Sequence, residues 1–424
     1  MKKTDKVRVL RLKVLNFGSC NMDYVYKLHH IAVTGETEHS DRMDVFAGGK
    51  GLNQSIAIAR AGADVCHAGC IGRDGELLLT AMRESGVDVT NVRVLNEKTG
   101  HAIIQVSDTG ENAIIVYAGA NACITEAFID EVLNGFSESD LLVLQNETSN
   151  VEYIIERAYE RGMRVVFNPS PISDTIGRVN FDHISFVILN EIEAKCISGS
   201  DIPEKFLAYM SEHHPNTRVL LTLGNKGCIY RDGEETLHQS AFSVEVVDTT
   251  AAGDTFTGYF VASLCQEIPA RDALRLASAA AAIAVSRKGA SPSIPYADEV
   301  RETLPSLREC GGGASGTSER LKGTVDDYLK RTYKDASLTE LAELLGYSAP
   351  YAGELVRKTL GKSFSALLHE KRCAIAAERL IGTEDSIREI IDGVGYSNES
   401  YFRKLFREIY GKTPFEYRKM RRNS

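Results

Sequence analysis

Short apolar runs, each bounded by polar or turn residues, recur through the first two thirds of the chain. They occupy residues 14–17, 141–144, 165–167, 186–189 and 219–222. Continuous apolar runs of this length are typical of strands in a parallel sheet that is covered on both faces. Helical patterns, such as residues 152–161, lie between them. This alternation predicts an α/β domain in which right-handed crossovers connect parallel strands.

The pattern changes at a Gly-rich segment, residues 310–318, whose composition is that of a flexible linker. No strand pattern follows it, and the remaining residues show only helical periodicity. We therefore predict an α/β domain at 1–305, a flexible linker at 306–319 and an all-α domain at 320–424.

The helical part contains the same signal twice, at an offset of 49 residues that becomes 50 at its end. Ser337 with Glu340, and Ser386 with Glu389, each have the spacing of a capping box before an apolar helix. Gly-Tyr-Ser follows at 346–348 and again at 395–397, where Gly346 and Gly395 end one helix and the serines begin the next. We predict helix-turn-helix units at about 337–360 and 386–410.

A long helix, about residues 365–380, is expected to join the two units. Apolar and aromatic side chains at helical spacing follow in the last long helix, and we assign them to the core: Tyr401, Phe402, Leu405 and Phe406. The exposed positions of each second helix would enter the major groove of DNA. These positions are Tyr351, Glu354, Arg357, Lys358, Asn398, Glu399, Ser400, Arg403 and Lys404.

The distribution of charge also distinguishes the two predicted domains. Residues 320–424 carry a formal net charge of +5 and residues 1–319 carry −14. A basic module behind an acidic one indicates that only the C-terminal part meets an anionic polymer. There is no run of 18 apolar residues and no secretory signal, so we expect no membrane partner. Nine scattered cysteines without a C-x-x-C pair are typical of reduced thiols in a cytoplasmic protein.

The sharpest chemical motif is Asp248-Thr-Thr-Ala-Ala-Gly-Asp-Thr-Phe256. A turn of small residues at a helix start exposes backbone N–H groups that bind an anion. A carboxylate beside an anion site, here Asp254, suits a general base that takes a proton from a hydroxyl. The small residues of this turn, with their backbone N–H groups, are Ala251, Ala252 and Gly253.

Two further polar clusters accompany this motif. Gly48-Gly-Lys-Gly-Leu-Asn-Gln54 lacks the spacing of a P-loop, but its glycines allow backbone to approach a ligand and Asn53 offers donors and acceptors. Asn21 and Asp23 follow the first predicted strand, at the edge where α/β sheets bind ligands.

Together these motifs resemble the ribokinase branch of the PfkB carbohydrate kinase family, from about Val7 to Pro295. Asn190-Glu-Ile-Glu193, Thr222-Leu-Gly-Asn-Lys-Gly227 and an Ala-rich block ending at Gly289-Ala290 and Ser293 also occur in family order. The resemblance implies a three-layer α/β/α sheet with a small β-lid. It also implies a phosphotransferase that uses ATP and Mg²⁺ and is activated by a monovalent cation such as K⁺.

The roles of individual residues follow from the same resemblance. The sugar would be held by Asn21, Asp23, Gly49, Lys50, Gly51, Asn53 and Glu147, beside Asp254. The nucleotide, its phosphates and Mg²⁺ would be organised by Asn190, Glu193, Thr222, Leu223, Gly224, Gly227 and Gly253. The monovalent cation would be held by Asp248 and Ser293 and by the carbonyls of Thr250, Ala284, Arg287 and Gly289.

Residues 321–418 resemble the DNA-binding domain of AraC/XylS-type transcription regulators, with the second repeat closest to the family pattern. A kinase joined to a DNA reader predicts a sugar-responsive transcription regulator that phosphorylates ribose or a related pentose. The resemblance also suggests a homodimer formed through the lid, near residues 24–46 and 100–118. Two alternatives stay open: a ribokinase-fold sensor without turnover, and a pentose or nucleoside kinase with an uncoupled DNA-binding module.

Overall fold

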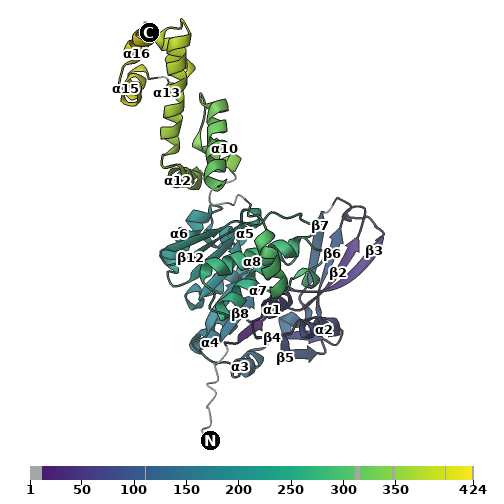
Figure 1. The fold of residues 1–424 in the computed structure, drawn as a ribbon. Helices are drawn as coiled ribbons and strands as arrows, with labels where there is room; N and C mark the ends of the chain where they lie inside the picture. The colour runs from purple at the N-terminus through teal and green to yellow at the C-terminus, as the bar shows by residue number, and fades with distance from the viewer. Residues whose placement is uncertain (1–11, 110, 311–315, 346–348, 397, 423–424) are drawn as a thin grey trace. The chain divides into compact units, whose positions relative to one another are not determined.

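The structure is a computed structural model that describes residues 12–109, 111–310, 316–345, 349–396 and 398–422. The chain divides after Cys310 into two compact units, an α/β unit and a helical unit (Figure 1). No helix of the described residues is long and apolar enough to cross a membrane. All nine cysteines are free thiols.

A nine-stranded sheet forms the centre of the first unit. Its order is β13-β12-β11-β10-β9-β8-β1-β4-β5, and every neighbouring pair is parallel except β11–β12 and β12–β13. The strands are β1 (Val14–Phe17), β4 (Val65–Gly72), β5 (Asp88–Leu95), β8 (Leu141–Gln145), β9 (Arg164–Asn168), β10 (Phe186–Asn190), β11 (Arg218–Thr222), β12 (Cys228–Asp232) and β13 (Glu235–Gln239). The predicted apolar runs are therefore central strands.

Helices cover both faces of this sheet, because successive side chains of a buried strand point to opposite sides. In β8, Val143 packs into one apolar core, and Leu142 and Leu144 pack into the other. The first face is covered by α1 (Lys50–Arg60), α2 (Glu76–Glu84), α7 (Ala252–Cys265), α8 (Ala270–Val285) and α9 (Ala297–Thr303). The second is covered by α3 (Glu126–Leu133), α4 (Val151–Glu160), α5 (Glu191–Ser198) and α6 (Pro203–His213). The predicted three-layer architecture is confirmed.

A separate four-stranded sheet is the predicted lid (Figure 1). Its order is β3-β2-β6-β7, formed by β2 (Asn21–Lys27), β3 (Arg42–Gly48), β6 (Gly100–Val106) and β7 (Asn112–Tyr117). The strand β2 starts only a few residues after β1 ends, so the lid is connected directly to the central sheet. The pairing of β2 with β6 begins at this connection, with Asn21 opposite Gly100.

The second unit is entirely helical within its described residues. It consists of α10 (Gly316–Thr332), α11 (Leu338–Leu345), α12 (Ala349–Leu360), α13 (Phe364–Gly382), α14 (Ile387–Gly393), α15 (Glu399–Tyr410) and α16 (Pro414–Arg422). Two apolar cores lie in it, one on each helix-turn-helix unit, and α13 supplies Phe364 to the first and Leu380 to the second. The predicted joining helix is confirmed as α13. The turn residues Gly346, Ser348 and Ser397 lie outside the described residues.

The two predicted capping boxes differ. Ser386 and Glu389 exchange both hydrogen bonds, as expected. Ser337 accepts from the Glu340 N–H at 3.1 Å, but the Glu340 carboxylate instead accepts from the Tyr328 hydroxyl at 2.7 Å. The same hydroxyl accepts a hydrogen bond from the Ser337 N–H at 3.0 Å. The Tyr328 side chain of α10 therefore takes the place that the Glu340 carboxylate would have in a capping box.

Ordered structure enters the predicted linker from both ends. Residues 308–310 hydrogen-bond to the α/β unit, and α10 begins at Gly316. Residues 311–315 lie outside the described part of the chain. The domain limits of 1–305, 306–319 and 320–424 stay predictions.

Candidate functional site

A cavity of about 470 Å³ lies at the carboxyl ends of β8 to β11, under the lid. Most of the residues that the sequence assigns to sugar, phosphate and catalysis line it together: Asn21, Asp23, Gly49, Lys50, Asn53, Glu147, Asn190, Glu193, Thr222, Ala251, Ala252, Gly253 and Asp254. Thr250, which the sequence assigns to the monovalent cation, also lines it. The lid adds an apolar wall of Ala102, Ile104, Ile114 and Val116. Gly51 does not line the cavity. A Cβ atom there would lie 2.3 Å from the Gly18 Cα, so Gly51 lets α1 approach the end of β1 closely.

Asp254 lies in the first turn of α7, and its carboxylate points into a polar clamp. The Asn53 side chain donates to one oxygen and the Gln54 side chain to the other, both at 3.0 Å. The side chain is 7% exposed, so water does little to solvate it. Two amide donors therefore hold the carboxylate in one orientation.

The turn before Asp254 has the geometry of an anion cradle. Ala251 is the N-cap of α7 and adopts φ 60°, in the left-handed region. The first N–H groups of a helix have no carbonyl partner within it, so those of α7 face the cavity mouth unpaired within the helix. A left-handed residue at this position explains why glycine would also fit here.

Several carboxylates and one ammonium line the cavity together. Burial, followed by the charges of Glu147 and Asp254, raises the pKa of Asp23 to about 7. Burial also raises the pKa of Glu147, although Lys50 opposes this. Burial disfavours the Lys50 ammonium, but the surrounding carboxylates outweigh it and raise the Lys50 pKa. The positive charge of Lys50 therefore offsets part of the repulsion between the surrounding carboxylates.

Glu147 is placed by the start of α1. Its carboxylate accepts from the Lys50 N–H at 3.0 Å and from the Ser19 hydroxyl. An acid at a helix N-terminus is stabilised by the unpaired N–H groups and the helix dipole. These contacts fix the carboxylate at the wall of the cavity.

A chain of amides behind Asp254 was not predicted from the sequence. Gln54 donates to Asn168 at 3.2 Å as well as to Asp254, and Gln145 donates to Gln54 at 2.7 Å. Asn168 and Gln145 end neighbouring strands, so the sheet itself orients the clamp. Gln54 belongs to the Gly-rich motif, and that adjacency was the only signal in the sequence.

A second cavity, of about 410 Å³, adjoins the first and shares Thr222, Thr249, Ala252 and Gly253 with it. Of the predicted nucleotide residues, Thr222, Gly224, Gly227 and Gly253 line it, whereas Leu223 packs against the apolar core. The sequence did not reveal its apolar walls, which include Phe242, Val244, Val246, Phe256, Ala281, Ala282 and Val285. Flat apolar walls beside a helix N-terminus suit a nucleobase and its phosphates.

Asn190 and Glu193 cap α5 at the cavity wall. The Asn190 side chain accepts from the N–H groups of Ile192 and Glu193, and the Glu193 carboxylate accepts from the Asn190 N–H at 2.8 Å. The capping box leaves further lone pairs of both side chains on the cavity side. Their oxygen donors fit Mg²⁺ and its bound waters.

Two of the residues assigned to a monovalent cation, Thr250 and Gly289, contact Asp248. One carboxylate oxygen accepts from the Thr250 N–H and hydroxyl, and the other accepts from the Gly289 N–H at 2.9 Å. Partial burial opposes ionisation, but these hydrogen bonds lower the Asp248 pKa. Ser293 donates to the Ala290 carbonyl in the same loop. The available donors are all oxygens, which fits an alkali cation.

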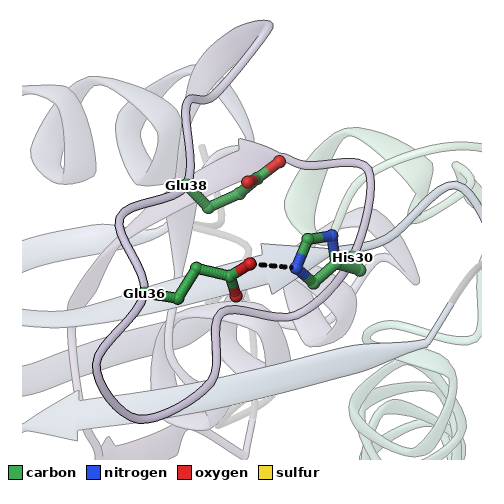
Figure 2. A group of neighbouring side chains, drawn as sticks. All are labelled: His30, Glu36 and Glu38. Carbon is green, nitrogen blue, oxygen red and sulfur yellow. Dashed lines mark hydrogen bonds and ion pairs between the residues drawn. The ribbon is translucent and has the colours of Figure 1, made fainter.

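Two polar clusters lie outside these cavities. In the β2–β3 loop, His30 bonds Glu36 at 2.8 Å beside Glu38 (Figure 2). Glu36 also accepts the Val33 N–H, so local pairing accounts for this exposed group and we assign no metal to it.

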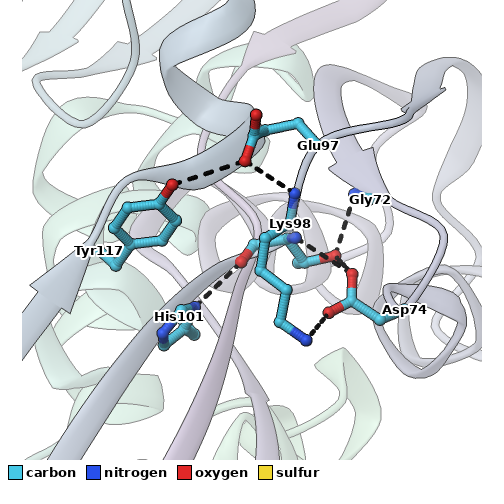
Figure 3. A network of polar contacts seen from close by, with 7 residues as sticks. Gly72, Asp74, Glu97, Lys98, His101 and Tyr117 are labelled. Carbon is cyan, nitrogen blue, oxygen red and sulfur yellow. Dashed lines mark hydrogen bonds and ion pairs between the residues drawn. The ribbon is translucent and has the colours of Figure 1, made fainter.

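At the base of the lid, Asp74 accepts the Thr99 N–H and hydroxyl and pairs with Lys98 (Figure 3). Partial burial opposes ionisation of Asp74, but these partners lower its pKa. The network ties the end of β4 to the start of β6, where the lid joins the central sheet.

The helical unit presents the predicted DNA-reading positions on α12 and α15. Arg357, Ser400 and Lys404 are exposed. Tyr351, Glu354 and Lys358 lie on α12, but their side chains are not among the described groups.

Three other predicted positions on the second unit have local partners. Asn398 caps α15 by accepting the Tyr401 N–H, and Glu399 forms an ion pair with Arg403. The cap uses only the side-chain oxygen of Asn398, whereas the ion pair holds Glu399 and Arg403 against each other.

The assignment of Tyr401 to the core is wrong. Phe402 and Phe406 are fully buried, but Tyr401 is 48% exposed and lies edge-on to His369 of α13. Helical spacing alone could not separate it from its neighbours, because it lies at the border of the apolar stripe. Exposed Arg407, which the sequence did not single out, adds positive charge to α15.

Comparison with known proteins decides the family. The model of the pfkB family carbohydrate kinases matches residues 11–297. The chain belongs to this family. The ribokinase of Haemophilus influenzae is 36% identical over 308 residues, which cover 70% of this chain and 99% of that protein. The ribokinase of Schizosaccharomyces pombe is 36% identical over 309 residues, covering 68% and 96%.

Solved PfkB structures agree with the fold. A Cryptococcus neoformans ribokinase in complex with ADP has a TM-score of 0.63 at 32% identity, and the match covers 69% of this chain and 99% of that one. An Arabidopsis thaliana ribokinase complexed with ribose and ATP has a TM-score of 0.61 at 29% identity, covering 69% and 98%.

A second family model, a helix-turn-helix domain, matches residues 341–420. Both resemblances are thus confirmed: the chain joins a PfkB carbohydrate kinase domain to a DNA-binding domain of the AraC type.

Proposed function

We propose that this protein is a sugar-responsive transcription regulator whose PfkB domain phosphorylates ribose or a related pentose with ATP. One observation carries the proposal. The clamped carboxylate of Asp254 and the N-terminus of α7 lie where the polar cavity and the apolar cavity meet. A base for the acceptor hydroxyl and a cradle for the transferred phosphoryl group are therefore adjacent.

The residues divide the chemistry between them. Asp254 accepts the proton of the sugar hydroxyl, and the N–H groups at the start of α7 stabilise charge on the phosphoryl group. Lys50 adds a positive charge on the same side. ATP supplies the phosphoryl group, and Mg²⁺ neutralises its charge when bound. Asn190 and Glu193 would hold that ion and the phosphates, and the Asp248 loop would hold K⁺.

The sugar is proposed from the polar set. The cavity is lined by several hydrogen-bond donors and acceptors, as a polyhydroxylated ring requires; they belong to Asn21, Asp23, Asn53 and Glu147. The relative with bound ribose and ATP supports a pentose. The apolar lid wall would cover the sugar and exclude water during transfer.

The regulatory half rests on α12 and α15, which we propose bind successive turns of the major groove. A homodimer would present two such domains. The outer face of the lid supports it, because Ile115 is 63% exposed and Tyr117 is 49% exposed there. Exposed apolar side chains on one sheet face favour pairing with a second copy.

The test is ATP turnover with a panel of pentoses and nucleosides in Mg²⁺, with and without K⁺. Ribose-dependent turnover in the wild type that Asp254→Asn abolishes would support the proposal. Glu36→Gln removes an exposed carboxylate that lines neither cavity and is the matched control. Sugar binding without turnover for any sugar would refute the kinase activity and leave a sensor.

Coupling is tested separately, by the affinity of the full chain for DNA selected from a random pool. Sugar plus a non-hydrolysable ATP analogue should change that affinity. An unchanged affinity would mean that the enzyme and the DNA reader act independently.

A further inference from the structure

The last residues of the kinase unit form a short strap, Arg308–Cys310, at the edge of the nucleotide cavity. The Cys310 N–H donates to the Ala241 carbonyl at 2.6 Å, and the Ser243 N–H donates to the Arg308 carbonyl at 2.8 Å. The strap thus runs antiparallel to the segment that follows β13, with one bridge between them. These bonds fasten the end of the unit to the cavity wall.

The strap is itself part of that wall. Cys310 lines the cavity, as do its partner Ala241 and the neighbouring Phe242 and Ser243. A second wall also contacts the strap, because Arg275 of α8 pairs with Glu309 at 3.8 Å. Residues further along α8 line the same cavity. The strap therefore touches two of the segments that would enclose a nucleobase.

Few interactions hold the strap. Two backbone hydrogen bonds and one long, partly exposed ion pair are each worth little net free energy. Cys310 is exposed. A ligand that contacts the ordered strap can therefore shift it between attached and detached states.

The strap lies between the residues that match the kinase family and the helical unit. The residues that match the carbohydrate kinase family end at 297, so the strap lies beyond them. From Cys310 the chain leads directly to the helical unit. The nucleotide wall and the point of departure toward the DNA-binding domain are thus the same residues.

We infer that the strap belongs to the nucleotide site, and that nucleotide binding orders the segment from which the DNA-binding domain departs. The inference rests on the proposed function, in which this cavity takes ATP. Linkage is reciprocal: the factor by which bound nucleotide favours the attached strap equals the factor by which detachment of the strap lowers nucleotide affinity. The nucleotide, rather than the sugar, is then the ligand that this end of the kinase unit senses.

Thiol labelling tests the first half of the inference. The full chain is treated with a small alkylating reagent, and modification of each cysteine is followed by peptide mass spectrometry. ADP should slow labelling of Cys310 severalfold, whereas ribose alone should not. Cys123 and Cys196 are exposed and line neither cavity, so their labelling rates serve as internal references.

Calorimetry with ADP on the same sample separates the possible failures. ADP that binds but leaves the Cys310 rate unchanged would overturn the inference and leave the kinase proposal intact. ADP that does not bind, together with absent turnover, would overturn both.

A pair of variants tests the second half. Cys310→Pro removes the N–H that bonds Ala241, whereas Cys310→Ala removes the thiol and keeps that N–H. The KM for ATP should be about fivefold higher in the proline variant than in the alanine variant, the loss of roughly one hydrogen bond. The KM for the sugar should differ less. Equal KM values for ATP in two variants with equal thermal stability would refute the role of the strap.

Discussion

The two cavities of the kinase unit meet at four shared residues but are built on opposite principles. Beneath its apolar lid wall, the cavity proposed for the sugar is lined by carboxylates, amides and an ammonium whose hydrogen bonds constrain one another. The nucleotide cavity is lined mainly by aliphatic and aromatic side chains. A polar site discriminates strongly, because a wrong ligand leaves buried groups unpaired, whereas an apolar site discriminates by shape and more weakly. Substitutions should therefore cost more on the sugar side.

The largest effect is expected at Asp254. Asp254→Asn keeps the size of the side chain but cannot accept a proton, so kcat should fall by about 10³-fold. Steady-state kinetics with a saturating sugar measures this. ADP affinity should change little, because the apolar cavity does not contact the carboxylate. A kcat within tenfold of the wild type would show that another group is the base.

The amide clamp should come next. Gln54→Leu leaves one Asp254 oxygen without a donor, and a bond to a charged group is worth about 1.5–3 kcal/mol, so kcat should fall roughly 10- to 100-fold. Gln145→Leu, one hydrogen bond further away, is the matched control and should lose less. The Tm of both variants separates positioning from misfolding, since loss of the clamp alone lowers kcat without lowering the Tm in step. Equal losses in both variants would point to general destabilisation.

The apolar side should respond more mildly. Ala281→Leu extends a side chain into the nucleotide cavity, and the KM for ATP should rise about tenfold, in line with typical overpacking costs. The KM for the sugar should be nearly unchanged. If both KM values rise together, the two cavities do not bind separate ligands as proposed.

The smallest effect concerns pH. Asp23 has a pKa of about 7, above its usual value, so it holds a proton in the folded protein that the unfolded chain has already released. Stability should therefore fall as pH rises from about 4 to 7, and Asp23→Asn should raise the Tm more at pH 8 than at pH 4.

Sugar binding should show the opposite trend. The ionised Asp23 is the better acceptor, so wild-type sugar affinity should rise severalfold from pH 6 to pH 8. Calorimetry with Asp23→Asn is the control. That variant should show weak affinity with little pH dependence, and a wild-type affinity that is flat over this range would contradict the expectation.

The polar cavity could be predicted from the sequence far better than the apolar one. Asn53 and Asp254 are polar residues in short glycine-containing motifs that no amphipathic pattern explains, so they stand out. Phe242 and Ala281 look like ordinary core residues, because an apolar wall and an apolar core have the same sequence pattern. Only the tertiary structure shows that they face a void.

Long-range partners account for the remaining differences. Ser337 and Glu340 have the right spacing for a capping box, but Tyr328 of the preceding helix competes for both groups. Gln54 is adjacent to a recognised motif, yet its role depends on Asn168 and Gln145, which lie on other strands. The spacing of residues in the sequence indicates local geometry, but it does not show which side chain from another element will form a hydrogen bond there.

The strand order has a consequence for synthesis on the ribosome. The first strand, β1, lies between β4 and β8, so it cannot be paired on both sides until residue 145 has been made. The strap must then follow before the nucleotide cavity has all of its walls. The helical unit is a compact unit of its own that is made after the α/β unit, and its helix–helix contacts are local and form quickly. Newly made chains should thus acquire a foldable sugar and nucleotide site before they acquire a DNA reader.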